Sequence, residues 1–173
     1  EVFRACLRLE HLFTCLAAHQ TSNSVLASRH IVTTIMYIMQ LLERPDFKAK
    51  LCKELSNAAK YLVKLQEYPD IDMHKIHNTI AKLELMMQHF LSSTGKIGQN
   101  LKEVDLLNTL RLHLMTPGGG LDFDVPLYHC WLHSPIADRL NDITTWVAEF
   151  AQVKQAVTLL LKIIRESSKM HPK

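Results

Sequence analysis

Glycine and proline are concentrated in one stretch of this 173-residue chain, and their scarcity elsewhere limits the fold more than any other feature. The segment from Thr116 to Pro135 holds three of the five glycines and three of the six prolines. Glycine adopts dihedral angles outside the helical region and proline lacks a backbone donor, so both residues interrupt helices. The rest of the chain is therefore able to continue as long helices, whereas this segment must leave the helical path.

Apolar residues recur at intervals of three and four along most of the chain, which is the spacing of an amphipathic helix. The pattern predicts helices over about 1–19, 24–43, 46–66, 72–91, 99–114 and 135–150, and a last one to about 166 that is either separate from its predecessor or continuous with it. The second half of 24–43 is apolar on nearly all sides, so we expect this helix at the centre. No segment has a strand pattern. The sequence predicts an all-α fold, a helical bundle of about six to eight helices in one domain over 1–173.

Within the glycine-rich segment we expect a loop over 116–125 and a short helix over 126–134. Pro126 suits the first turn of that helix, because its missing N–H would be unpaired there anyway. Either Asp124 or Val125 is expected to begin it, and the loop carboxylates Asp122 and Asp124 are expected to cap it. Ser134 and Pro135 have the form of a cap and a first-turn proline for the next helix. We expect Trp131 mainly to pack in the core.

Composition excludes several classes of protein. The longest apolar stretch, 31–42, is too short for a membrane span and is interrupted by polar residues, so we expect a buried helix and no membrane insertion. The net charge of +3 is mild, and nucleic-acid binders usually carry a denser basic stripe, so we expect no nucleic-acid partner. The four cysteines are widely spaced, which favours reduced thiols in the cytosol.

The short helix contains the one cluster that suggests chemistry. His129 and His133 are four residues apart and share a face, and with Cys130 they are the start of a zinc site or of a thiol-dependent active site. A structural zinc site needs four ligands, and a zinc peptidase needs a glutamate beside its first histidine, which is absent here. Adjacent helical residues point about 100° apart, so His133 rather than His129 is placed to reach Cys130. A metal- or thiol-dependent enzyme is the alternative function.

Recognition of a partner is the preferred function, because tryptophan, tyrosine, histidine and arginine concentrate binding energy in interfaces. We expect the two histidines to face solvent beside the nearby arginines and the basic stripe of the first helix: Arg111, Arg139, Arg4, Arg8 and His11.

Short motifs spread over most of the chain resemble those of one family. They are Leu7-Arg8-Leu9-Glu10, Ile97-Gly98-Gln99, Pro117-Gly118-Gly119 followed by Phe123-Asp124-Val125-Pro126, and His129-Cys130-Trp131-Leu132-His133-x-Pro135, with Thr145-Trp146 and Ile164-Arg165 further on. In these motifs the chain is similar to the ZapD family of Z-ring-associated cell-division proteins. The block from Pro117 to His133 is the most specific part.

The resemblance implies a non-enzymatic, cytoplasmic division factor that works at midcell without a cofactor. Members of the family are dimers with an α-helical domain and a β-rich domain. They bind the C-terminal tail of FtsZ, a tubulin-like protein, and bundle its filaments to promote Z-ring assembly. This chain would be the helical domain, and the β-rich domain would lie largely outside residues 1–173.

The resemblance also implies that basic residues of the helical domain contact the FtsZ tail. Arg8, His129 and Arg139 occupy positions that match the motifs, and Arg111 and His133 complete the candidate set. Asp105 stands where the family often has a basic residue, which is a departure from its pattern. A second group of motif residues is expected to build the corner that presents the short helix: Pro117, Gly118, Gly119, Asp124, Pro126 and Trp131.

Overall fold

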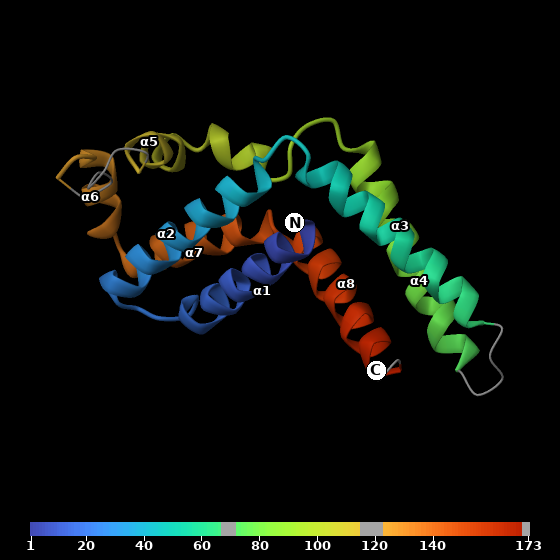
Figure 1. Cartoon of the computed structure of the whole chain (residues 1–173). Coiled ribbons are helices and arrows are strands. Elements are labelled where there is room, and N and C mark those ends of the chain that lie inside the picture. The colour runs from blue at the N-terminus through green and yellow to red at the C-terminus, as the bar shows by residue number, and fades with distance from the viewer. Residues whose placement is uncertain (67–71, 115–122, 171–173) are drawn as a thin grey trace.

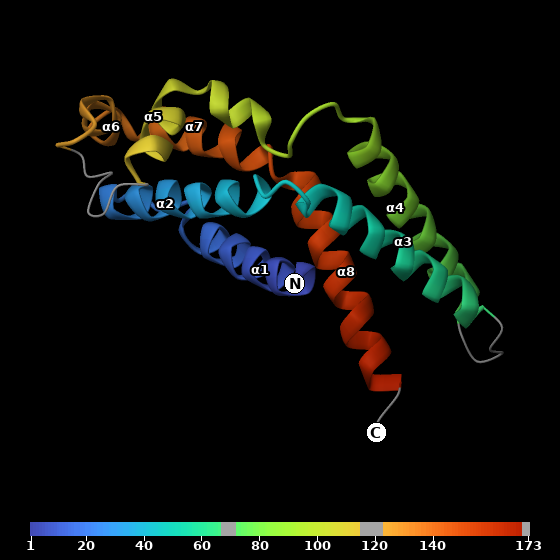
Figure 2. The ribbon, with the colours of Figure 1, turned by 45° about the horizontal axis from the view of Figure 1, so that its top comes forward.

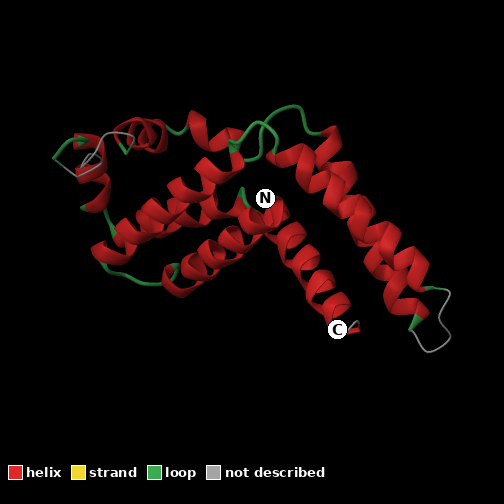
Figure 3. Ribbon diagram, viewed as in Figure 1, coloured by secondary structure: helices red, strands yellow, loops and turns green. Residues whose placement is uncertain are grey.

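The computed structural model of the chain describes residues 1–66, 72–114 and 123–170, with side chains up to position 167. Within these ranges the chain forms α-helices, one 3-10 helix (η1) and no strand, which confirms the predicted all-α fold (Figure 3). In chain order these elements are α1 Val2–His19, α2 Val25–Leu42, α3 Phe47–Leu65, α4 Met73–Ser92, η1 Gln99–Glu103, α5 Asp105–His113, α6 Pro126–Leu132, α7 Ile136–Ala148 and α8 Ala151–Met170.

The helices form an elongated bundle with a projecting arm (Figure 1). The arm is the antiparallel pair α3 and α4, whose two helices pack along each other. In the body, α1 packs against α2 on one side and α8 on the other, and α2 also contacts α6 and α7. Both views place α6 at the opposite end of the molecule from the tip of the arm (Figure 2). The surfaces between α1 and α2 and between α4 and α8 therefore belong to different parts of the bundle.

Helix α2 is the core helix, as its apolar sequence predicts. Its buried residues lie on most sides and include Ile31, Ile35 and Ile38, each at most 1% exposed. Ser24 caps its start, with its hydroxyl oxygen accepting a hydrogen bond from the N–H of Ala27 at 3.0 Å. By length and composition α2 is the one described helix that would be able to cross a membrane, yet 61% of it is buried in the bundle. The core helix of a globular domain has the same composition, and α2 occupies that position.

One predicted helix differs in the structure. The helix expected over 99–114 is divided at Val104, whose extended backbone (φ −80°, ψ 109°) separates η1 from α5. Leu101 before the break and Leu107 after it are both buried, at 2% and 0% exposed. Gly98 precedes η1 in the left-handed region (φ 74°), which suits glycine, and a Cβ at this position would lie 3.4 Å from the ring of Phe150. Phe150 itself lies in the break between α7 and α8, which are separate helices.

The corner before α7 is only partly as predicted. Pro126 is in the first turn of α6, and Val125, one of the two predicted starting residues, is its N-cap residue. No side chain caps the helix, so the capping role expected for Asp124 is wrong, and Asp122 lies outside the described residues. Pro135 takes the N-cap position of α7 and no side chain caps that helix, so the predicted Ser134 cap with a first-turn proline is wrong. The Ser134 hydroxyl instead donates to the Trp131 carbonyl at 2.7 Å and closes the end of α6. The expectations for Pro117, Gly118 and Gly119 lie outside the described residues.

Candidate functional site

A groove between α1 and α2 brings cationic and apolar side chains together at the surface. Its volume is about 520 Å³. One wall comes from α1 and the other from the second half of α2 and the residues after it: Leu7, Arg8, His11, Leu12, Tyr37, Gln40, Leu41 and Arg44. Two of these residues are arginines, one is a histidine, and no carboxylate lines the groove. The groove is therefore suited to a ligand that carries negative charge beside apolar groups.

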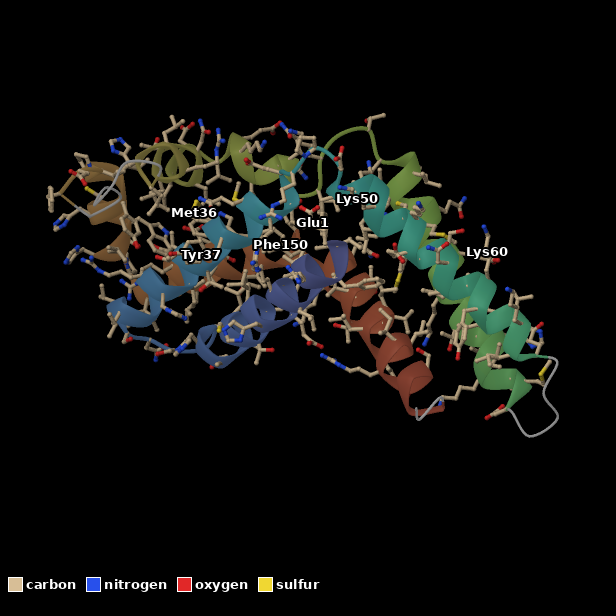
Figure 4. The ribbon with its side chains drawn as sticks, viewed as in Figure 1. Glu1, Met36, Tyr37, Lys50, Lys60 and Phe150 are labelled. Carbon is tan, nitrogen blue, oxygen red and sulfur yellow. The ribbon has the colours of Figure 1, made fainter. Side chains whose placement is uncertain are left out.

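The helical repeat of α1 explains why this face is available. The residues that recur every three or four positions point into the bundle and are at most 4% exposed: Cys6, Leu9, Phe13 and Leu16. Leu7, Arg8 and His11 lie on the other side of the helix and are exposed. On the opposite wall Tyr37 lies between α2 and α1 in Figure 4 and is 52% exposed, although most of α2 around it is buried. An exposed tyrosine and an exposed leucine, at 48% for Leu7, give the groove apolar surface that the core does not use.

The cationic character extends beyond the groove toward the start of α1. Arg8 and Arg44 also line an adjoining hollow of about 570 Å³, together with Arg4, Ala5 and Glu1. Arg4 and Arg8 are one turn apart on α1, and both are exposed. Within the described residues no ion pair involves Arg4, Arg8 or Arg44. Their charges are therefore available to an external anion.

Arg111, one of the predicted binding residues, contacts other residues of the same chain. Its guanidinium lies 3.7 Å from the carboxylate of Glu43 and donates to Asn108 at 3.3 Å. Lys102 approaches the other oxygen of Glu43 at 3.2 Å, an ionic contact without hydrogen-bond geometry. These contacts fasten η1 and α5 to the end of α2, beside Arg44. The structure thus gives Arg111 a part in positioning one wall of the groove.

Arg139 was expected on the binding surface, but the structure buries it. Only 5% of the residue is exposed, and its Nη1 donates to the carbonyl oxygens of Leu132 at 2.6 Å and Ser134 at 2.8 Å. Carbonyl groups at the end of a helix have no partner within the helix, so a buried guanidinium satisfies them. Arg139 therefore joins the end of α6 to α7, and its charge is not presented to solvent.

His129 and His133 both lie on the exposed face of α6, as predicted. Their rings are 4.3 Å apart between centroids, and His133 Nδ1 lies 2.9 Å from the His129 carbonyl oxygen, so that nitrogen carries the proton. Trp131 points the other way: its Nε1 donates to Asp142 at 2.8 Å, and its ring lies 5.3 Å from that of Trp146. Trp131 is partly buried and packs against the core. The sequence pattern therefore assigned these side chains correctly to outward and inward groups.

The enzyme alternative finds no assembled site in the described part of the chain. No group of three or more histidine, cysteine or acidic residues there is arranged to hold a metal ion. Cys130 is exposed on α6, and the Nδ1 of His133, the histidine expected to reach it, is directed to the His129 carbonyl instead. In the described part of the chain, a cysteine contacts a histidine on α1 instead, where Cys15 Sγ lies 3.7 Å from His11 Nε2.

One ion pair links α1 to α8 at the surface. Arg165 donates two hydrogen bonds to the carboxylate of Glu10, at 2.7 and 2.6 Å. The hydrogen bonds and charge of Arg165 hold the pKa of Glu10 below its ordinary value. On the buried side of α1, burial and the charge of Glu54 raise the pKa of the Cys6 thiol to about 11, so this thiol is protonated at neutral pH.

The predicted binding residues do not all come together. Arg8 lines the groove, Arg111 lies behind one of its walls, and Arg139 is buried. Both views place α6, with its histidines, away from the start of α1 (Figures 1 and 2). Arg44 and Tyr37 were not predicted from the sequence as groove residues. The available signal was Arg44 just after an apolar helix and before Pro45, which suggests an exposed cation at a helix end.

Sequence comparisons relate the chain to cell division proteins. Residues 7–173 match a family described as "ZapD: Cell division protein". The cell division protein ZapD of Coxiella burnetii (strain RSA 331 / Henzerling II) is 36% identical over 168 residues, which are 97% of this chain and 65% of that protein. The protein of the same name from Ralstonia nicotianae is 33% identical over 167 residues, 96% of this chain and 66% of the relative. The chain thus spans about two thirds of the length of the relatives it matches.

Proposed function

Because the chain belongs to the ZapD family of cell division proteins, we propose that it binds the C-terminal tail of FtsZ in the α1–α2 groove and crosslinks FtsZ filaments. The observation that carries this proposal is the groove itself, in which Arg8, His11 and Arg44 surround apolar surface without a carboxylate. An acidic peptide with apolar side chains complements both features. The family resemblance adds His129 to the proposed contact surface as a separate part on α6. His133 lies beside His129 on the same helix.

The physics of exposed charges predicts a weak single site. Exposed ion pairs contribute about 0.2–1 kcal/mol each, and salt screens them over a Debye length of about 8 Å at physiological ionic strength. Bundling nevertheless requires only that two such sites belong to one particle. We propose a homodimer, whose two-fold symmetry duplicates the groove, so that binding of the second tail benefits from a high effective concentration.

The proposal describes a non-enzymatic protein that works in the cytoplasm at midcell, with no cofactor, no nucleic-acid partner and no membrane insertion. The names of its relatives support a role in cell division. The β-rich domain that the resemblance implies would lie outside residues 1–173.

Charge reversal in the groove tests the proposal. The double variant Arg8→Glu, Arg44→Glu replaces two attractions with two repulsions, so we expect tail binding to weaken about thirtyfold, given roughly 1 kcal/mol for each reversal. The measurement is co-sedimentation of purified variants with FtsZ polymers, at two salt concentrations. The matched control is Lys53→Glu, Lys60→Glu, which makes the same change in net charge on the outer face of α3, where Lys60 points away from the body (Figure 4).

His129→Ala tests the α6 part of the surface separately, and we expect it to reduce bundling without changing the circular dichroism spectrum. Wild-type bundling by both the groove variant and His129→Ala would rule out the proposed site. Equal loss in the groove variant and in the Lys53, Lys60 control would mean that net charge alone governs the assay.

A further inference from the structure

A second cationic groove lies between α4 and α8, away from the α1–α2 groove. Its volume is about 660 Å³. Lys82 of α4 and Lys154 and Lys162 of α8 line it, and Met86 and Leu159 supply apolar surface that packs against the core. As in the first groove, none of the described lining residues is acidic. The two grooves share no residue and are built from different helix pairs.

Within the described residues, the lysine side chains of the second groove do not bind other residues of the chain. All three are exposed, and among the described residues none of them takes part in an ion pair or hydrogen bond. Other lysines do have partners: Lys48 donates to backbone oxygens beyond the end of α4, and Lys50 pairs with Asp46 at 3.4 Å. Like charges placed around one hollow repel each other, so an anionic occupant would be stabilised there.

The chemistry of the lining favours a peptide. Sites for single-stranded nucleic acid combine a cationic track with aromatic side chains on which bases stack. Among the described residues that line this groove, none is aromatic and none is an arginine. Membrane attachment through lysines uses a larger cluster of about four to eight cations beside the lipid surface. Three lysines around a hollow with a methionine and a leucine at its base instead match carboxylates spaced along a chain that also carries apolar side chains.

We propose that the α4–α8 groove is a second site for an acidic peptide and that its occupant is another copy of the FtsZ tail. The identity of the peptide rests on the proposed function, whereas the existence of a second anionic-peptide site does not. Because the grooves lie on separate helix pairs, both can be filled together. One chain then holds two tails, and a chain is able to crosslink filaments even before it dimerises.

Binding stoichiometry tests the proposal directly. Isothermal titration calorimetry at low salt uses the chain and a synthetic peptide with the FtsZ C-terminal tail sequence. We expect two peptides per wild-type chain and one per chain for Lys154→Glu, Lys162→Glu. The charge-matched control Lys53→Glu, Lys60→Glu should still bind two. A peptide in which every Asp and Glu is replaced by Asn or Gln should lose binding at both sites.

The outcomes separate the two proposals. One peptide per wild-type chain, or two per chain in the Lys154, Lys162 variant, overturns the second site. If that variant binds one peptide while Arg8→Glu, Arg44→Glu still binds two, the second site stands and the α1–α2 assignment fails. If the lysine substitutions abolish binding to a DNA oligonucleotide or to phosphatidylserine vesicles and leave tail stoichiometry at two, the peptide assignment of this groove is wrong.

Discussion

Replacing Arg139 with methionine is expected to destabilise the fold, because this arginine is a structural link. Its Nη1 donates to two carbonyl oxygens at the end of α6, those of Leu132 and Ser134, and only 5% of the residue is exposed. Methionine has a similar length and no donor. The substitution therefore removes both hydrogen bonds and leaves two carbonyl groups without their partner, while it keeps much of the apolar packing of the side-chain stem.

The expected loss in the free energy of unfolding follows from these contacts. Hydrogen bonds to charged groups contribute about 1.5–3 kcal/mol each, so two of them amount to about 3–6 kcal/mol. Arg139 Nε is buried without a partner, and removing that unsatisfied donor returns about 1–3 kcal/mol. The midpoints of these two ranges, about 4.5 and about 2 kcal/mol, give a net destabilisation of about 2.5 kcal/mol. With a urea dependence of about 2 kcal/mol per molar, the unfolding midpoint should fall by roughly 1–2 M.

Urea unfolding followed by circular dichroism measures this shift, with Arg8→Met as the matched control. Arg8 is exposed and makes no described ion pair, so its replacement should change stability by no more than about 0.5 kcal/mol. If Arg139→Met is as stable as the control, Arg139 does not have the structural role that its buried hydrogen bonds indicate. If it keeps full stability and also loses FtsZ bundling, Arg139 acts in the contact surface, as the motif suggested.

Two further predictions concern α1. The pKa of Glu10 is lowered by Arg165, so this pair contributes its full stability above the ordinary glutamate pKa and loses it as the pH falls through the lowered value. Glu10→Gln should therefore be less stable than the wild type in urea unfolding at pH 7 and indistinguishable from it in strong acid; an equal deficit at both pH values would contradict the assignment. In thiol labelling of the native protein, exposed Cys130 should react at once. Cys6, which is 0% exposed and whose pKa is raised to about 11 by burial, should react only on unfolding, and immediate reaction of all four cysteines would show that the α1 packing is not maintained in solution.

The helices themselves were largely predictable, because each buries one face whose apolar residues recur at helical spacing in the local sequence. Cys6, Leu9 and Phe13 mark the inward face of α1 without reference to any other helix. The break at Val104 was not predictable in the same way. Valine is acceptable in a helix, and nothing in the local pattern marks its extended conformation, which lies between buried Leu101 and buried Leu107.

The site was less predictable, since charge alone does not show whether an arginine faces solvent. Charged residues are rarely buried unless paired, so exposure was the reasonable expectation for Arg111 and Arg139. The partner of Arg111 is Glu43, which is distant in the sequence at the end of α2. The partners of Arg139 are backbone carbonyl groups, which leave no signal in the sequence. Grooves pose the same difficulty. Tyr37 sits within an apolar run that predicts burial, and only the placement of α1 beside α2 reveals it as groove surface.

The most specific motif block therefore has two kinds of residue, and the structure separates them. Trp131 is held by Asp142, and Ser134 closes the end of α6, so both serve to build the corner. His129 and His133 remain outside, where the same construction orients them. Residues that build a corner and residues that it presents are constrained together, so a shared motif cannot by itself assign a contact role. Arg44 illustrates the converse: it lies outside every motif, yet it shares the groove with Arg8, and the charge-reversal experiment therefore has to change both.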